Sequence, residues 1–193
     1  MEKQLSEMTL EELWELFPIF LTEHKEEWAE QYETAATKLK EILSPYRIVR
    51  ISHIGSTSIK NIWAKPIVDI LVEIASDEDM DAVANVIANN GYIKMWESEK
   101  QISFNAGYTN KGFADEVFHL HLRFQGDNNE LYFRDYLNEH SDVAKDYENM
   151  KLKLWHQYEY DRDGYTNAKS DFIIKYTMKA KEVYKNKYGE IKF

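Results

Sequence analysis

Hydrophobic and polar residues alternate most regularly over residues 116–124, EVFHLHLRF. Strict alternation is typical of a β-strand whose two faces lie in different surroundings. The apolar side chains would share one face and pack into a core: Phe118, Leu120, Leu122 and Phe124. The nitrogen-bearing side chains would share the other face: His119, His121 and Arg123. We therefore expect a half-buried strand with a concentrated polar surface.

A second strand is predicted over the run IVDILV at residues 67–72, which is apolar except at Asp69. A continuous apolar run of this length favours a strand that is covered on both faces. A carboxylate buried there needs a hydrogen-bonding partner or a cation, because burying it alone is costly. Asp69 is therefore a candidate functional residue.

The rest of the chain predicts three more strands and a series of helices. The strands span residues 46–54, 92–96 and 101–108, and residues 109–115 form a loop. Apolar stripes at helical spacing predict helices over residues 10–16, 21–43, 76–90, 131–138, 143–158 and 167–188. Thr9 and Glu12 match a capping box at the start of the first helix.

This order of elements predicts an α/β (α+β) fold, with a mixed sheet of four to five strands flanked by helices. We expect one domain over residues 1–193, which is long enough to bury roughly 70% of its unfolded surface. Its parts would be N-terminal helices at 1–44, a sheet core at 45–125 and a helical C-terminal portion at 130–190.

The composition excludes several classes of site and partner. The chain has no cysteine, which rules out disulfides, thiolate zinc sites and cysteine nucleophiles. Its net charge of −10 argues against broad, nonspecific binding of nucleic acid. The acidic first residues do not match a signal peptide, and no apolar run approaches the ~20 residues that cross a bilayer. We therefore expect a cytoplasmic protein without a membrane partner.

The clustered carboxylates of the run Ser76-Asp77-Glu78-Asp79 could indicate a metal site. Serine and aspartate are common at helix N-termini, where they cap the free backbone N–H groups. We therefore interpret this run as a helix cap.

The motif HIGSTS at residues 53–58 predicts a tight turn that can hold an anion. Gly55 lets the backbone approach a ligand closely, and the next three residues add hydroxyl groups and free N–H groups at a helix start. The predicted phosphate-binding residues of this turn are Gly55, Ser56, Thr57 and Ser58. Together with Asp69, such a turn matches the plan of a metal-dependent nucleotide site.

A nucleotidyltransferase needs carboxylates on adjacent strands to hold divalent ions against the reacting phosphorus. A second carboxylate would ordinarily lie at position 71, which is leucine here. Glu73 shares the face of Asp69 but lies about 6–7 Å further along the strand than position 71. We keep Glu73 as a catalytic candidate, although it could replace the missing ligand only with a shift in geometry.

The histidine face could complete this site in more than one way. Asp69 with His119 and His121 could bind a divalent metal, Mg²⁺ or Mn²⁺ and in principle Zn²⁺. Imidazole favours Mn²⁺ or Zn²⁺ over Mg²⁺, because Mg²⁺ prefers oxygen ligands. Either histidine could instead act as a base near pH 7, or donate hydrogen bonds to phosphate. The remaining alternative is a hydrogen-bonded polar wall without chemistry.

Three motifs together resemble the GrpB family, which belongs by fold to the polymerase-beta-like nucleotidyltransferase superfamily. They occur in this order: HIGSTSIKNIWAKPIVDILVEI, FHLHLRF and LYFRDYLNEHSDVAKDYENMKLKLW. The resemblance implies that Gly55 and Ser56 form the Gly-Ser turn of that superfamily and that Asp69 is its first catalytic aspartate. Leu71 departs from the paired acidic pattern of the superfamily.

Further basic residues in or near these motifs are candidates for binding phosphate or another anion. They are Lys65, Arg123, Arg134 and Lys151. Tyr147 lies one helical turn before Lys151 and would face the same cleft. The alternative for Arg134 is a helix-packing salt bridge with Asp135.

The sequence therefore predicts a nucleotidyltransferase that uses a nucleoside triphosphate and an unidentified acceptor. The alternative is a non-catalytic protein that binds a nucleotide, another phosphorylated small molecule or another anion, and that has lost the second carboxylate. A third hypothesis is a protein-interaction surface. It rests on the nine acidic residues among residues 1–30 and the seven lysines among residues 165–193.

Overall fold

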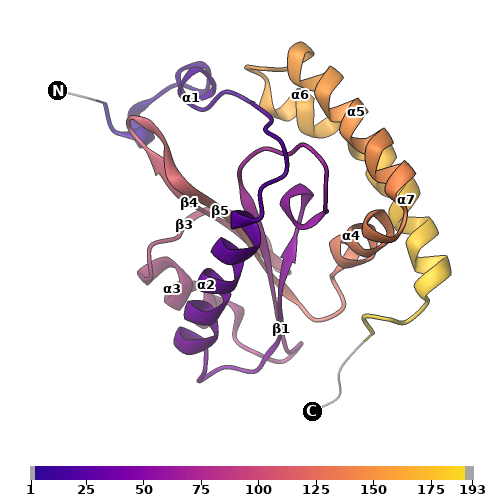
Figure 1. Cartoon of the computed structure of the whole chain (residues 1–193). Helices are drawn as coiled ribbons and strands as arrows, with labels where there is room; N and C mark the ends of the chain where they lie inside the picture. Colours follow the sequence, from indigo (N-terminus) through magenta and orange to yellow (C-terminus); the bar gives the residue numbers. More distant parts are fainter. Residues whose placement is uncertain (1–2, 190–193) are drawn as a thin grey trace.

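A computed structural model describes residues 3–189, so residues 1–2 and 190–193 of the predicted domain lie outside the described residues. The helical and strand segments alternate along the chain as follows (Figure 1). They are η1 (Leu5–Glu7), α1 (Leu10–Leu16), α2 (Glu27–Ile42), β1 (Ile48–Ile54), η2 (Ser56–Ser58), β2 (Val68–Ile74), α3 (Met80–Asn89), β3 (Ile93–Glu97), β4 (Gln101–Thr109), β5 (Gly112–Phe124), α4 (Asn129–Glu139), α5 (Ser141–Gln157), α6 (Arg162–Asn167) and α7 (Ser170–Tyr184).

The strands form one mixed sheet in the order β1-β2-β5-β4-β3. Only β2 and β5 run parallel, and the other neighbours pair antiparallel. The register between the parallel strands places Asp69 beside His119 and Leu71 beside His121. The sequence motif of β2 and the histidine face of β5 therefore meet at the centre of the sheet.

Helices cover the two faces of the sheet in separate groups (Figure 1). One face packs against α2 and α3 in the main apolar core, to which β2 contributes Val68, Ile70, Val72 and Ile74. The other face carries Asp69, Leu71 and Glu73 because side chains alternate along a strand. There Leu71 packs against Leu131 of α4. The helices α4, α5 and α7 share a second apolar core, which includes Tyr136, Val143, Tyr147 and Ala180.

The structure confirms the predicted fold class and corrects three boundaries. The predicted loop at 109–115 is a tight turn, and β5 already begins at Gly112. The helix predicted over 21–43 begins only at Glu27, because residues 18–24 run mostly without regular structure and Thr22 makes a β-bridge with Ala64. The helix predicted over 167–188 is α7, which begins at Ser170 and ends at Tyr184, and a separate short helix, α6, lies before it at Arg162–Asn167.

The predicted helix caps are confirmed at two sites. Thr9 and Glu12 form the capping box of α1. Asp79 accepts a hydrogen bond from the Ala82 N–H at the start of α3, so the acidic run at 76–79 caps a helix.

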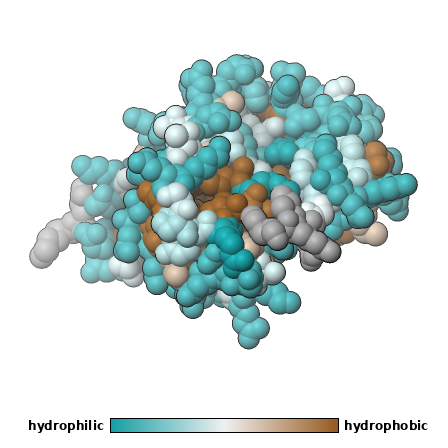
Figure 2. Space-filling view, turned by 90° about the horizontal axis from the view of Figure 1, so that it is seen from below, coloured by the Kyte–Doolittle hydropathy of each residue, from teal (hydrophilic) through white to brown (hydrophobic). Residues whose placement is uncertain are grey.

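The face of the molecule in Figure 2 is mostly hydrophilic, and its largest apolar area lies near the centre of the view. No helix among the described residues is long and apolar enough to cross a membrane. The expectations of a single domain and of a cytoplasmic location stay predictions.

Candidate functional site

A cavity of about 800 Å³ lies between the sheet and the C-terminal helices. Its wall includes Gly55 and Ser56 of the predicted turn, Asp69 of β2 and His119 of β5. Five cationic side chains also line it: Lys65, Lys151, Arg162, Lys169 and Lys181. The structure thus brings the predicted turn, carboxylate and histidine together and adds cations from α6 and α7.

Gly55 is required where the turn passes Asp69. Its φ of +72° lies in the left-handed region that favours glycine. A Cβ atom built on Gly55 would lie 2.8 Å from Cγ of Asp69, which is far closer than a van der Waals contact. The glycine therefore lets the backbone of the turn pack directly against the carboxyl group.

Two of the three hydroxyls that follow Gly55 build the turn. Thr57 is buried and donates a hydrogen bond to the Ile67 carbonyl at 3.2 Å. Ser58 donates to the Gly55 carbonyl at 2.7 Å. Ser56 lines the cavity and hydrogen-bonds with the Tyr147 phenol. Of the predicted phosphate-binding hydroxyls, Ser56 alone faces the cavity, and those of Thr57 and Ser58 have structural roles.

Asp69 is held as a carboxylate by two histidines. Its Oδ1 lies 3.3 Å from Nδ1 of His119 and 3.7 Å from Nε2 of His121. Burial alone would raise the pKa of Asp69, but its polar interactions with His119 and His121 outweigh this effect and hold that pKa far below its usual range. The carboxylate therefore stays ionised at neutral pH.

His119 belongs to a chain of hydrogen bonds that reaches α6. The Tyr108 hydroxyl lies 2.8 Å from Nε2 of His119 and accepts a hydrogen bond from Arg162 at 2.9 Å. Burial lowers the pKa of His119, against the raising effect of Asp69, so we assign a neutral ring. On this assignment Nδ1–H donates to Asp69 and Nε2 accepts from Tyr108. These hydrogen bonds therefore connect the carboxylate on β2 with the guanidinium on α6.

Two lysines at the cavity have unusually acidic ammonium groups. Burial, aided by the charges of Lys169 and Arg162, lowers the pKa of Lys65 to about 7. Burial lowers the pKa of Lys169 to about 8. Both amines lie over the ring of Tyr165, at 5.5 Å and 4.1 Å from its centroid. Within residues 3–189 neither amine makes an ion pair or a hydrogen bond. An anion in the cavity would therefore stabilise the protonated form of both amines.

Lys151 lines the same cavity but already has a partner. Its ammonium group donates a hydrogen bond to the Trp63 carbonyl, and Glu148 accepts one from the Trp63 N–H at 2.7 Å. Burial lowers the pKa of Lys151 to about 7. Lys151 and Glu148 together hold the loop that carries Lys65, so we reassign Lys151 from phosphate binding to positioning this loop.

Glu73 lies outside the cavity, which corrects its assignment as a catalytic candidate. The side chain is fully buried, 2.6 Å from Arg50, and accepts hydrogen bonds from Gly126 N–H at 3.0 Å and Asn128 at 2.9 Å. These contacts tie β2 to β1 and to the turn after β5. Glu73 therefore has a structural role, and the distance along the strand keeps it from the Asp69 site.

Arg123 is likewise not free to bind phosphate. Its guanidinium pairs with Asp127 at 3.2 Å and with Glu130 at 2.8 Å, which fixes the start of α4 against β5.

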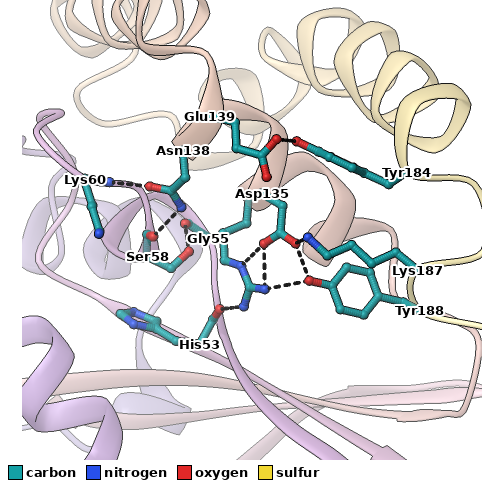
Figure 3. A network of polar contacts seen from close by, with 11 residues as sticks. His53, Gly55, Ser58, Lys60, Asp135, Asn138, Glu139, Tyr184, Lys187 and Tyr188 are labelled. Atoms are coloured by element: carbon teal, nitrogen blue, oxygen red, sulfur yellow. Dashed lines mark hydrogen bonds and ion pairs between the residues drawn. The ribbon is translucent and has the colours of Figure 1, made fainter.

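Arg134 belongs to a structural network on α4 (Figure 3). It donates hydrogen bonds to the His53 carbonyl at 2.8 Å and to the Tyr188 hydroxyl at 3.1 Å, and it pairs with Asp135 at 2.7 Å. The salt bridge with Asp135, the alternative for Arg134, is therefore present, and the guanidinium already has partners in the fold. On the same helix, Asn138 donates to the Ser58 carbonyl at 3.0 Å, so α4 fixes the Gly-Ser turn.

The arrangement does not fit a preformed metal site. Both histidines lie nearest to the same oxygen of Asp69, at 3.3 Å and 3.7 Å, rather than around a shared point in the cavity. Over residues 3–189 no group of three or more His, Asp or Glu side chains is arranged to hold a metal ion. Position 71, where a second carboxylate would lie, is sealed because Leu71 packs with Ile54 and Leu131. One carboxylate and two imidazoles are also a poor donor set for Mg²⁺.

Several residues that the structure places at the site have no motif in the sequence. Arg162 comes from α6, Lys169 from the N-cap of α7 and Tyr108 from β4, far along the chain from HIGSTS. The excess of lysine after residue 165 is the one available signal, and by itself it indicates an interaction surface rather than a cavity.

A family model described as "GrpB protein" matches residues 18–179 of the chain. The chain belongs to the GrpB family. It is 35% identical over 162 residues to the glutamate-rich protein GrpB of Alkalihalophilus pseudofirmus, which covers 80% of this chain and 91% of that protein. It is also 35% identical over 153 residues to the UPF0157 protein YqkA of Bacillus subtilis, where the match covers 78% of this chain and only 43% of YqkA.

Solved structures support the fold. The GrpB protein from Enterococcus faecalis has a TM-score of 0.72 at 29% identity and covers 86% of this chain and 99% of its own. The Cid1 poly(U) polymerase with Mg 3'-dATP bound has a TM-score of 0.52 at 10% identity, over 76% of this chain and 49% of that one. At this identity the likeness to Cid1 shows the fold alone. The GrpB-family chain therefore has a nucleotidyltransferase-like fold.

Proposed function

We propose that this protein binds a phosphorylated small molecule, with a nucleoside triphosphate as the expected class, through its phosphate groups in the central cavity. The observation that carries this proposal is the convergence of Lys65, Arg162 and Lys169 on the cavity beside Gly55 and Ser56. Five cationic side chains line the cavity against three carboxylates, those of Asp69, Glu130 and Asp163, and Glu130 already pairs with Arg123. A polyphosphate would supply the missing negative charge.

Each group has a defined part in this proposal. The two lysines bind phosphate oxygens as point charges, and the guanidinium of Arg162 can bind two oxygens at once. Ser56 offers a hydroxyl at the turn. Asp69 cannot approach phosphate closely because of its charge, so it accepts a hydrogen bond from a hydroxyl of the ligand or of an acceptor. The nucleotidyltransferase-like fold supports the choice of a nucleotide among phosphorylated ligands.

The proposal is tested by titrating nucleoside triphosphates into the protein by calorimetry. Lys65→Met and Lys169→Met should each weaken binding by about tenfold or more, because each removes a charge-assisted contact worth roughly 1.5–3 kcal/mol. Lys153→Met is the matched control, because Lys153 is exposed on α5 and does not line the cavity. Equal effects of all three substitutions, or no binding by the unmodified protein, would refute the proposal.

A second candidate function is transfer of a nucleotidyl group to an acceptor. The observation that favours it is the ionised Asp69 beside the Gly-Ser turn, hydrogen-bonded to a neutral His119 that could accept a proton. The test is release of pyrophosphate with Mg²⁺, Mn²⁺ or Zn²⁺ added, comparing the protein with Asp69→Asn. Release that Asp69→Asn abolishes supports transfer. If the protein binds the nucleotide tightly but releases no pyrophosphate with any of these metals, nucleotidyl transfer is refuted and the binding function stands.

A further inference from the structure

The cavity has an apolar rim as well as a cationic interior. Trp14 of α1 and Ile174 and Met178 of α7 line it, together with the lysines of the interior. Ile174 is 56% exposed and Met178 is 62% exposed, although both are large and apolar. The cavity therefore offers two kinds of surface to one ligand, charged groups inside and apolar groups at its edge.

Trp14 is held at this edge by residues that follow it in the chain. Phe17 packs against the rings of Tyr108 and Phe113 of the β4–β5 hairpin, with centroids 4.8 Å and 5.0 Å apart. Ile19 N–H donates a hydrogen bond to the Glu159 carbonyl at 2.8 Å, which ties the same segment to the loop before α6. In Figure 1, α1 and α6 lie at the same end of the molecule. The C-terminal end of the helix that carries Trp14 is thus anchored both to the hairpin and to the loop before α6.

The ring of Trp14 is available to a ligand. It pairs with no other aromatic ring and with no cation among residues 3–189, whereas Tyr147 and Tyr165 of the same cavity both have such partners. No residue of α1 is buried, so the helix contributes little to the core and its tryptophan is not explained by packing. An indole face beside a cationic cavity suits a planar aromatic group that is joined to phosphates.

We infer that Trp14 stacks on the base of the bound nucleotide. This inference rests on the proposed function and narrows its ligand class from phosphorylated small molecules to nucleotides. Stacking on an aromatic ring accepts any base, so it favours nucleotides over inorganic polyphosphate without choosing one base. Trp14 lies before residues 18–179, the part that matches the GrpB family model.

The experiment compares the affinities of a nucleoside triphosphate and of inorganic tripolyphosphate, titrated separately into the same protein. For the unmodified chain the nucleotide should bind about tenfold or more tightly than tripolyphosphate, which is the scale of one base–aromatic stack. Trp14→Ala should abolish this ratio and leave the affinity for tripolyphosphate unchanged, and Trp14→Phe should keep most of the ratio. Trp96→Ala is the control, because Trp96 is 55% exposed on β3 and does not line the cavity.

The outcomes separate this inference from the proposed function. If Trp14→Ala leaves the ratio of the two affinities unchanged while both ligands bind, the base does not stack on Trp14 and the binding function stands. If neither ligand binds the unmodified protein, the binding function fails and the inference fails with it. A thermal melt of each variant shows whether the fold is intact, and Trp14→Phe provides the conservative comparison.

Discussion

The affinity for a polyphosphate should fall as the pH rises from 7.5 to 9.5. The pKa of Lys65 is lowered to about 7 and that of Lys169 to about 8 in the free protein, so both amines lose protons in this range. A bound polyanion favours the protonated amines, so binding takes up protons and weakens as they become scarce. The phosphates of the ligand are already ionised above pH 7.5 and do not oppose this trend.

The size of the effect follows from the two pKa values. An amine that must be protonated in the complex weakens binding by up to about tenfold for each pH unit above its free pKa. Between pH 7.5 and 9.5 this gives up to roughly 80-fold for Lys65 and roughly 25-fold for Lys169. Loss of fold cannot cause the decrease, because a lysine whose pKa is lowered in the folded state makes the protein more stable as the pH rises through this range.

The assay is a calorimetric titration at several pH values, with Lys65→Arg as the decisive variant. Arginine keeps its charge at pH 9.5, so this variant should lose the Lys65 part of the pH dependence and bind more tightly than the unmodified protein at that pH. The heat measured in buffers of different ionisation enthalpy gives the proton uptake directly. A pH-independent affinity between 7.5 and 9.5, or the same slope in Lys65→Arg, would refute the reasoning.

Two further substitutions test the structural assignments. Gly55→Ala should lower the free energy of unfolding by more than the ~1–2 kcal/mol of a positive φ alone, because its Cβ would also collide with Asp69. Urea unfolding measures this against Gly91→Ala, where φ is also positive but the space is open. Glu73→Gln should destabilise the fold by about 3 kcal/mol, because it leaves Arg50 without its buried charge partner. The nucleotide affinity per folded molecule of this variant should stay unchanged. A selective loss of binding or turnover would show that Glu73 has a role in the functional site.

The core of the site could be predicted from the sequence because its signals are local. Gly55 breaks a strand, Asp69 interrupts an apolar run, and the alternation around His119 fixes which face the imidazole occupies. The strand register that joins them follows from the nucleotidyltransferase-like fold, which the GrpB motifs implied. These elements needed only patterns over a few residues and one family resemblance.

The roles of the basic residues could not be predicted. The role of a charged side chain depends on its partners in the folded protein, and its position in the sequence does not reveal them. Arg134 and Arg123 looked as suitable for phosphate as Lys65, yet each is paired with carboxylates through contacts made in the folded chain. Arg162 and Lys169 lie on short or C-terminal helices whose approach to the sheet depends on tertiary packing. Trp14 reaches the cavity only because Phe17 anchors α1 on the hairpin.

A crystal structure of the protein with a nonhydrolysable nucleoside triphosphate would show directly whether Lys65 and Lys169 bind phosphate. Phosphate oxygens should lie within about 2.7–3.2 Å of both amines, beside Ser56 in the central cavity. Arg123 and Arg134 should keep their carboxylate partners. Phosphates bound outside this cavity, or held by Arg123 or Arg134, would contradict the proposed binding site.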